Sequence, residues 1–135
     1  MEIEKVGLDT GFFLRLLQGN PLAIEIYEQI LDDKLCGVVS VIVAFELKRL
    51  SLKSGNIVDP DAYSVLEQSL PSLFEIIPLD LELALEAALV SHGTGLPTAD
   101  AIIYTTYKKA GCKIVYTVDS HFKRVSQGVP QIVIF

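Results

Sequence analysis

The chain has 135 residues, half of them apolar, and a net charge of -6 at pH 7. This length suits one domain with a substantial core, and the mean hydropathy of +0.44 indicates an unusually apolar interior or an apolar surface for a partner. The acidic balance excludes a protein that holds nucleic acid by bulk electrostatics, because such binding needs a basic footprint. It leaves room for nucleic-acid binding through a metal ion and a local basic patch.

No uninterrupted apolar run approaches the roughly 20 residues of a membrane-spanning helix. Residues 1–5 (MEIEK) lack the basic head and apolar body of a signal peptide, so we expect a cytoplasmic protein without a membrane segment. Cys36 and Cys112 lie far apart in the sequence and show no CxxC or Cys/His spacing. We therefore expect reduced, buried thiols and no zinc site.

Residues 5–10 (KVGLDT) predict a short strand that ends in an acid, Asp9. A helix with an apolar stripe follows and stops at residues 19–21 (GNP). Thr10 has two interpretations. Its hydroxyl can hold a carboxylate or a water molecule, or it can cap the helix.

A second amphipathic helix is predicted over residues 21–31, followed by a strand over residues 35–39 (LCGVV). Ser40 can cap the helix after that strand. The predicted inward side chains of the second helix are Leu22, Ile26, Tyr27 and Ile30.

The third predicted helix runs from Val41 to about Ser54 and contains an unusual acid, Glu46. Glu46 lies one turn from Ile42 and one turn from Leu50, so it shares the face expected to pack inward. A carboxylate on an apolar face must be paired, neutral or bound to a cation. A buried ion pair and a metal site both remain open for this residue.

The middle of the chain predicts two more helices and a strand. A helix over residues 62–70 is expected to end at Pro71, and residues 74–79 (FEIIPL) predict a peripheral strand because Pro78 cannot donate to a sheet. The next helix is predicted over residues 81–91, followed by a loop. Its predicted inward side chains are Leu81, Ala84, Leu85, Ala88 and Leu89, with Glu82 and Glu86 facing water.

Residues 96–111 predict a helix that starts at Pro97, has Thr98 as a possible cap and closes at Gly111. Its predicted inward stripe is Ala99, Ile102, Ile103, Thr106 and Ala110. Asp100 falls in the first turn, where the helix dipole alone favours an acid by roughly 0.3–1 kcal/mol. However, no other Asp, Glu, Lys or Arg lies between Glu86 and Lys108, so a functional role is equally open.

Asp119 follows residues 114–118 (IVYTV), a short β-branched and aromatic run that predicts a buried strand. It can cap the next segment or belong to a ligand site, because ligands bind beyond the carboxyl ends of parallel strands. Residues 131–135 predict the last strand. Five strands separated mostly by helices predict an α/β fold with a doubly wound parallel sheet.

If the first and fourth strands are neighbours, the carboxylates of Asp9, Glu46, Asp100 and Asp119 can converge on one crevice. Two unit charges about 4 Å apart repel by roughly 4 kcal/mol at an effective dielectric of 20. Such a cluster therefore needs protons or a cation, and ligation by oxygen alone suits Mg²⁺ or Mn²⁺. These ions activate water and bind phosphate oxygens, so the predicted chemistry is phosphodiester hydrolysis.

The sequence resembles the PIN domain family in four segments, and within it most resembles the toxin ribonucleases of VapBC toxin–antitoxin systems. The segments are residues 8–10 (LDT), 45–47 (FEL), 96–104 (LPTADAIIY) and 117–122 (TVDSHF). The resemblance implies a single PIN domain over residues 1–135, a three-layer α/β/α sandwich with a five-stranded parallel sheet. It also implies a Mg²⁺- or Mn²⁺-dependent endoribonuclease that is a homodimer and is inhibited by a small antitoxin protein.

The resemblance also implies roles for individual residues. Asp9 and Asp100 would hold the metal most directly, Asp119 would ligate it or hold a metal-bound water, and Glu46 would orient water or a second ion. Thr10 and Thr117 would support these acids with their hydroxyls. The bases near the acids in sequence have two interpretations, contacts to the RNA backbone or scattered surface charges: Lys48, Arg49, Lys53, Lys123 and Arg124.

Several alternatives stay open. His121 can touch substrate or simply be exposed, and a PIN fold can serve as a catalytically silent binding or scaffold module. Hydrolysis of a DNA phosphodiester is also possible, because carboxylate–metal chemistry does not itself read a 2′-hydroxyl. A receiver-type phosphoacceptor is disfavoured, because Asp9 is followed by Thr10 rather than by a second acid.

Overall fold

The computed structural model describes residues 2–53 and 55–135. Its central sheet has five parallel strands, as predicted, and their order is β3-β2-β1-β4-β5. The strands are β1 (Glu4–Leu8), β2 (Leu35–Ser40), β3 (Glu75–Ile77), β4 (Ile114–Thr117) and β5 (Gln131–Ile134). The helices are α1 (Thr10–Leu17), α2 (Pro21–Leu31), α3 (Val41–Ser51), α4 (Pro60–Leu73), α5 (Leu81–Thr94), α6 (Thr98–Lys109) and the short 3-10 helix η1 (Ser120–Val125).

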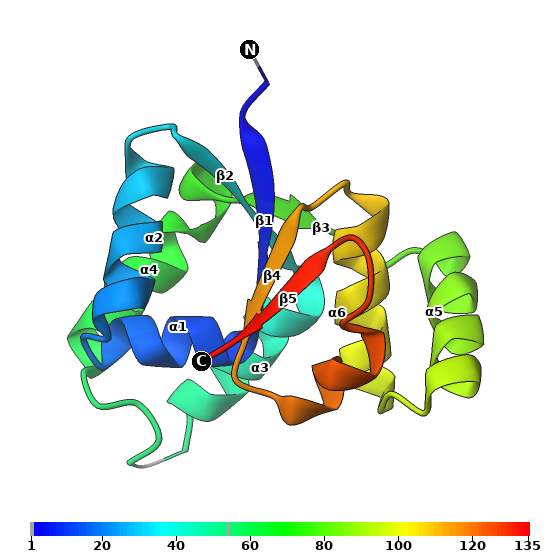
Figure 1. Cartoon of the computed structure of the whole chain (residues 1–135). Coiled ribbons are helices and arrows are strands. Elements are labelled where there is room, and N and C mark those ends of the chain that lie inside the picture. The colour runs from blue at the N-terminus through cyan, green and yellow to red at the C-terminus, as the bar shows by residue number, and fades with distance from the viewer. Residues whose placement is uncertain (1, 54) are drawn as a thin grey trace.

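Helices cover both faces of the sheet and make three layers. Figure 1 shows α1, α2 and α4 on one side of the strands and α6 on the other, with α5 lying outside α6. Helix α3 contacts both α1 and α6, so it lies where the two helical layers approach each other. The β3 strand is at an edge of the sheet, as its proline-containing sequence predicted.

The first and fourth strands, β1 and β4, are neighbours in the sheet. This was the condition under which the four predicted acids could converge on one crevice. In β1 and β4, Gly7 pairs with Val115 and Leu8 with Tyr116, and the backbone N–H of Asp9 continues the ladder by donating to the Tyr116 carbonyl at 3.0 Å. The strand order reverses direction between these two strands, so the crevice at their carboxyl ends is the topological switch point of the sheet.

A buried tyrosine ties the carboxyl ends of β1 and β2 to α6. The Tyr107 hydroxyl donates to the Leu8 carbonyl and accepts from the Ser40 N–H at 3.1 Å. Its ring lies against Gly7, where an added Cβ would come within 2.4 Å of a ring carbon. Tyr107 therefore holds in place the strand end that leads directly into Asp9.

We expect Tyr107→Phe to lower the free energy of unfolding by about 1–3 kcal/mol, because it leaves the buried Ser40 N–H and Leu8 carbonyl without this partner. Urea unfolding measures the change. Tyr27→Phe on α2 is the control, because Tyr27 is only half-buried and a change within about 0.5 kcal/mol is expected there. Equal losses in the two variants would contradict the bridging role of Tyr107.

Several predicted helix boundaries are wrong. Helix α4 continues through Pro71 to Leu73. The proline lacks the N–H that would bond the carbonyl four residues earlier, but the Phe74 N–H still bonds the Leu70 carbonyl and closes the last turn. Helix α5 extends to Thr94 and ends at Gly95, whose φ of 75° suits glycine. Helix α3 ends at Ser51, and the predicted end at Ser54 lies outside the described residues.

The predicted inward face of α5 is also wrong. Leu83 and Ala87 are buried, whereas Leu81, Leu85 and Leu89 are 60–76% exposed. In α2, Leu22 is exposed and Ala23 takes the inward place. Helix α6 is buried on nearly every side, because it lies between the sheet and α5. Thr98 does not cap it, since the capping position is Pro97.

Candidate active site

Asp9 is held at the end of β1 by two threonines. It caps α1, with its Oδ1 accepting from the Thr10 N–H at 2.7 Å, and its Oδ2 accepts from the Thr117 hydroxyl at 2.6 Å. The residue as a whole is 5% exposed, so the carboxylate is nearly enclosed by protein. Both oxygens of the carboxylate are thus fixed in direction by the strand ends.

Thr117 links the acid after β1 to the acid after β4. Its hydroxyl donates to Asp9 and accepts from the Asp119 N–H at 3.0 Å, and the residue is fully buried. Asp119 in turn caps η1, where its Oδ1 accepts from the His121 N–H at 2.9 Å. Asp119 therefore does cap the next segment, and its carboxylate also lies close enough to Asp9 and Asp100 to raise the pKa of both.

The Glu46 side chain reaches the neighbourhood of Asp9 from α3. The Thr10 hydroxyl donates to Glu46 Oε1 at 2.6 Å, so the residue after Asp9 also holds the acid of α3. The predicted face of α3 needs a correction: Val43 and Leu47 are the buried residues, and Glu46 is half-buried at the border of that face. This border position lets the carboxylate reach the site while remaining partly solvated.

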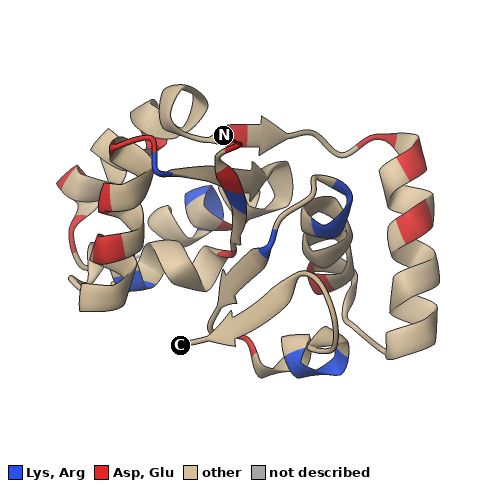
Figure 2. Ribbon diagram, turned by 45° about the horizontal axis from the view of Figure 1, so that its top comes forward, with Lys and Arg blue, Asp and Glu red and all other residues tan. Residues whose placement is uncertain are grey.

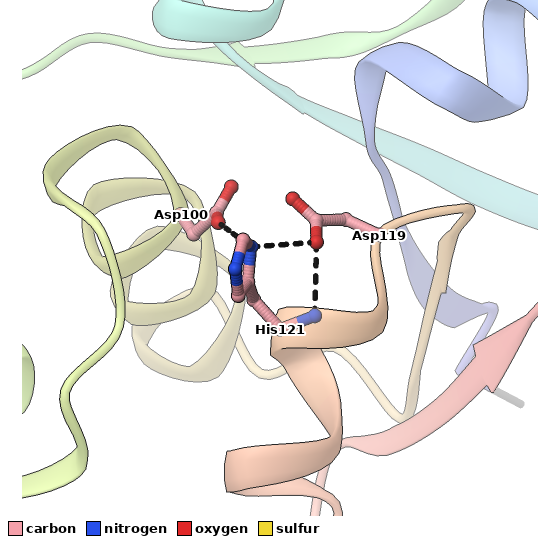
Figure 3. A group of neighbouring side chains, drawn as sticks. All are labelled: Asp100, Asp119 and His121. Atoms are coloured by element: carbon pink, nitrogen blue, oxygen red, sulfur yellow. Dashed lines mark hydrogen bonds and ion pairs between the residues drawn. The ribbon is translucent and has the colours of Figure 1, made fainter.

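Asp100 enters from the first turn of α6 and is connected to Asp119 through a histidine. The His121 Nδ1 lies 2.9 Å from Asp119 Oδ1 and 3.5 Å from Asp100 Oδ2 (Figure 3). The Asp100 side chain is 14% exposed. The sequence did not indicate this position of His121, because the residue after a turn gives no signal of which way its ring points.

Burial and mutual repulsion disfavour the charged forms of these acids. Burial raises the pKa of Asp9 to about 6; hydrogen bonds from Thr117 and Thr10 oppose the rise, and the Glu46 and Asp119 carboxylates add to it. Burial and then the charge of Asp119 raise the pKa of Asp100 to about 7. Asp9 is therefore repelled by Glu46 and Asp119, and Asp100 by Asp119 and Asp9, and a bound cation would offset this repulsion.

The donor set fits a divalent cation. Oxygens of Asp100 and Asp119 and a ring nitrogen of His121 lie within 4.8 Å of one another. The negative charge of Asp9 adds to the rise in the pKa of Asp100, so Asp9 also faces this group. Carboxylate oxygens are the ligands that Mg²⁺ and Mn²⁺ prefer, and acids with raised pKa values gain most from a bound cation.

Only some of the basic residues predicted to contact RNA lie near the acidic side chains of the site. Arg49 and Lys53 line a hollow of about 220 Å³ together with Thr10 and Glu46. Lys48 instead pairs with Glu67 of α4 at 3.0 Å, and these two residues line a different hollow. On η1, Arg124 donates to the Gly95 carbonyl and Lys123 is exposed. Figure 2 shows basic residues on η1 and acidic residues on α5.

The fold and these side chains define a doubly wound α/β protein whose carboxylates gather at the topological switch point. The sequence model of the PIN domain family matches residues 6–128. The chain therefore belongs to the PIN domain family. No curated protein sequence matches the chain significantly.

Solved structures share this fold at low sequence identity. A toxin–antitoxin complex from Klebsiella pneumoniae has a TM-score of 0.68 and 20% identity, covering 95% of both chains. DNA-bound VapBC from Salmonella typhimurium has a TM-score of 0.68 and 20% identity, covering 97% of this chain and 98% of the other. VapC20 from Mycobacterium tuberculosis, a toxin that cleaves the sarcin–ricin loop, has a TM-score of 0.65 and 19% identity over 93% and 97% of the chains.

No helix among residues 2–53 and 55–135 is long and apolar enough to span a membrane. In the same part of the chain, Cys36 and Cys112 are both free cysteines. Cys112 is buried, as predicted, whereas Cys36 is only half-buried.

Proposed function

We propose that this protein is a metal-dependent endoribonuclease that hydrolyses RNA phosphodiester bonds, with Mg²⁺ or Mn²⁺ at its acidic site. The observation that carries the proposal is the gathering of Asp9, Glu46, Asp100 and Asp119 at one end of the sheet, with the pKa values of Asp9 and Asp100 raised to about 6 and 7. Isolated surface acids would not show such shifts.

Asp9, Asp100 and Asp119 would hold the ion, which when bound would activate water and neutralise charge on the phosphate. Thr117 keeps Asp9 and Asp119 in fixed positions, and Thr10 does the same for Asp9 and Glu46. Since the Thr10 hydroxyl engages Glu46 Oε1, Oε2 is the oxygen that would orient or deprotonate the attacking water.

The substrate backbone would lie over the hollow beside Glu46. Arg49 and Lys53 line that hollow and supply positive charge next to the acids, which an anionic substrate needs in a protein of net charge -6. Lys123, exposed on η1, would extend the contact on the other side of Asp119. Lys48 is a weaker candidate for this role because it is already paired with Glu67.

A VapC-like toxin paired with a small antitoxin is the biological role we propose, with a cytoplasmic location. Among the proteins that share the fold, the Klebsiella structure is a toxin–antitoxin complex, the Salmonella structure is DNA-bound VapBC and the Mycobacterium protein is a toxin. We also propose a homodimer through apolar helix surface in the N-terminal half. There, Phe45 on α3 and Val65 on α4 are 63% and 65% exposed.

Incubation with a pool of structured and single-stranded RNAs tests the activity. We expect cleavage with Mg²⁺ or Mn²⁺, none with EDTA, and a loss of at least about 100-fold in Asp9→Asn, since loss of even a supporting group at a metal site lowers affinity or activity by about 10- to 100-fold. Asparagine can still cap α1, so the variant should stay folded. Cleavage that ignores both EDTA and the Asp9 substitution would contradict the proposal.

A matched pool of single-stranded DNA separates ribonuclease from general phosphodiesterase activity. If neither pool is cut and calorimetry shows no bound ion, the catalytically silent binding module becomes the better interpretation.

A further inference from the structure

We propose that His121 is a nitrogen ligand in this metal site, so that the site prefers transition-metal ions over Mg²⁺. The inference rests on the proposed metal dependence and adds a ligand that carboxylate chemistry alone does not supply. Its basis is the position of the ring between two acids, with Nδ1 2.9 Å from Asp119 Oδ1 and 3.5 Å from Asp100 Oδ2 (Figure 3).

The backbone around His121 fixes where its ring can lie. The His121 N–H donates to the carboxylate of Asp119, which caps η1, so the residue is tied to the acid that its ring also contacts. The next residue, Phe122, is fully buried and anchors η1 in the core. The Arg124 side chain bonds the Gly95 carbonyl, which connects η1 to the loop before α6, the helix that carries Asp100.

This anchoring distinguishes His121 from an ordinary surface histidine. Although its side chain is 47% exposed, the ring is in contact with two partly buried carboxylates rather than with solvent alone. Coordination through Nδ1 would require a neutral ring with its proton on Nε2, so that the ion would replace the direct contact between Nδ1 and the Asp119 carboxylate. Two oxygens and one nitrogen would then face a single ion.

A nitrogen donor changes which ion is preferred. Mg²⁺ is bound by oxygen ligands and gains little from imidazole, whereas affinity for mixed nitrogen and oxygen sites rises from Mn²⁺ through Co²⁺. We therefore expect this site to bind Co²⁺ more tightly than Mn²⁺, and Mn²⁺ more tightly than Mg²⁺. The ratio of these affinities should depend on His121.

Calorimetric titration of the full chain with Co²⁺, Mn²⁺ and Mg²⁺ tests the inference in the parent, His121→Ala and His92→Ala. His92 is the other histidine of the sequence; it lies exposed on α5 and is the matched control. In His121→Ala we expect Co²⁺ affinity to fall about 10- to 100-fold and Mg²⁺ affinity to change less than about threefold. The visible absorption spectrum of bound Co²⁺ should change in His121→Ala and stay unchanged in His92→Ala.

Equal losses for Co²⁺ and Mg²⁺, or no loss for either, would overturn the nitrogen ligand. RNA cleavage in the parent would then still support the proposed function, because the two readouts are separate. The protein could also show an ion preference that depends on His121 and yet cut no RNA. That result would support His121 as a metal ligand and contradict the proposed ribonuclease activity. A parent chain that binds none of the three ions would overturn both.

Discussion

Replacing Asp100 with asparagine should abolish RNA cleavage and at the same time stabilise the metal-free protein. The substitution removes a candidate metal ligand, so we expect activity to fall by at least about 100-fold. It also removes a half-buried charge. Burial, the charge of Asp119 and the charge of Asp9 raise the pKa of Asp100 to about 7, so the ionised form of Asp100 is unfavourable in the folded protein. At pH 8 without metal, the free energy of unfolding should therefore rise.

The matched control is Asp61→Asn. Asp61 also lies in the first turn of a helix, α4, but it is exposed and stands apart from the acidic cluster. If Asp100 served only the helix dipole, both variants would lose up to about 1 kcal/mol of stability. We expect that small loss only in Asp61→Asn, with cleavage unchanged. Cleavage at the parent's rate in Asp100→Asn would remove Asp100 from the site.

The second large effect is on the pH dependence of stability. Without metal, we expect the free energy of unfolding to fall as pH rises from about 4 to about 7. The folded protein holds protons on Asp9 and Asp100 up to pH values near 6 and 7, whereas the unfolded chain releases them near 3.8. Over that interval the folded state binds more protons, so raising the pH favours unfolding.

The fall should be on the order of a few kcal/mol, since one pKa unit corresponds to roughly 1.4 kcal/mol. Urea unfolding in EDTA at pH 4.5 and 7.5 measures it. Saturating Mn²⁺ at pH 7.5 should restore the lost stability, because an ion that binds only the folded state stabilises it. Asp100→Asn should show a smaller fall than the parent. Stability that rises steadily from pH 4.5 to 7.5 without metal would show that these acids are not held in a repelling cluster.

Much of the site follows from local sequence. Asp9 and Asp119 come directly after short apolar strands, and parallel strands bring their carboxyl ends to one edge of the sheet. The prediction that the acids converge required β1 and β4 to be neighbours, and these two strands do pair in the sheet. Thr10 and Thr117 also lie at these strand ends. Their hydroxyls, however, bond Glu46 and Asp9, which are 36 and 108 residues away, so these bonds depend on the packing of α3 and on the pairing of β1 with β4.

The faces of the outer helices did not follow from sequence. In α5, leucines and alanines lie on every side, so the stripe of Leu81, Leu85 and Leu89 is as apolar as the stripe that contains Leu83 and Ala87. Periodicity does not choose between two apolar stripes, and the helix buries the one that fits α6. The basic residues of α3 divide in a similar way, with Arg49 beside Glu46 and Lys48 paired with a residue of α4.

Capping residues, chain breaks and apolar runs are local properties, so the order of the elements, the family and the acids at the strand ends could be predicted from the amino-acid sequence. The buried helix faces, the position of the His121 ring and the contacts of Tyr107 at the strand ends could be found only in the folded protein. Tyr107 reaches Leu8 across 99 residues and Ser40 across 67, and His121 meets Asp100 from another element. Such contacts depend on how whole elements pack, and no stretch of neighbouring residues contains that information.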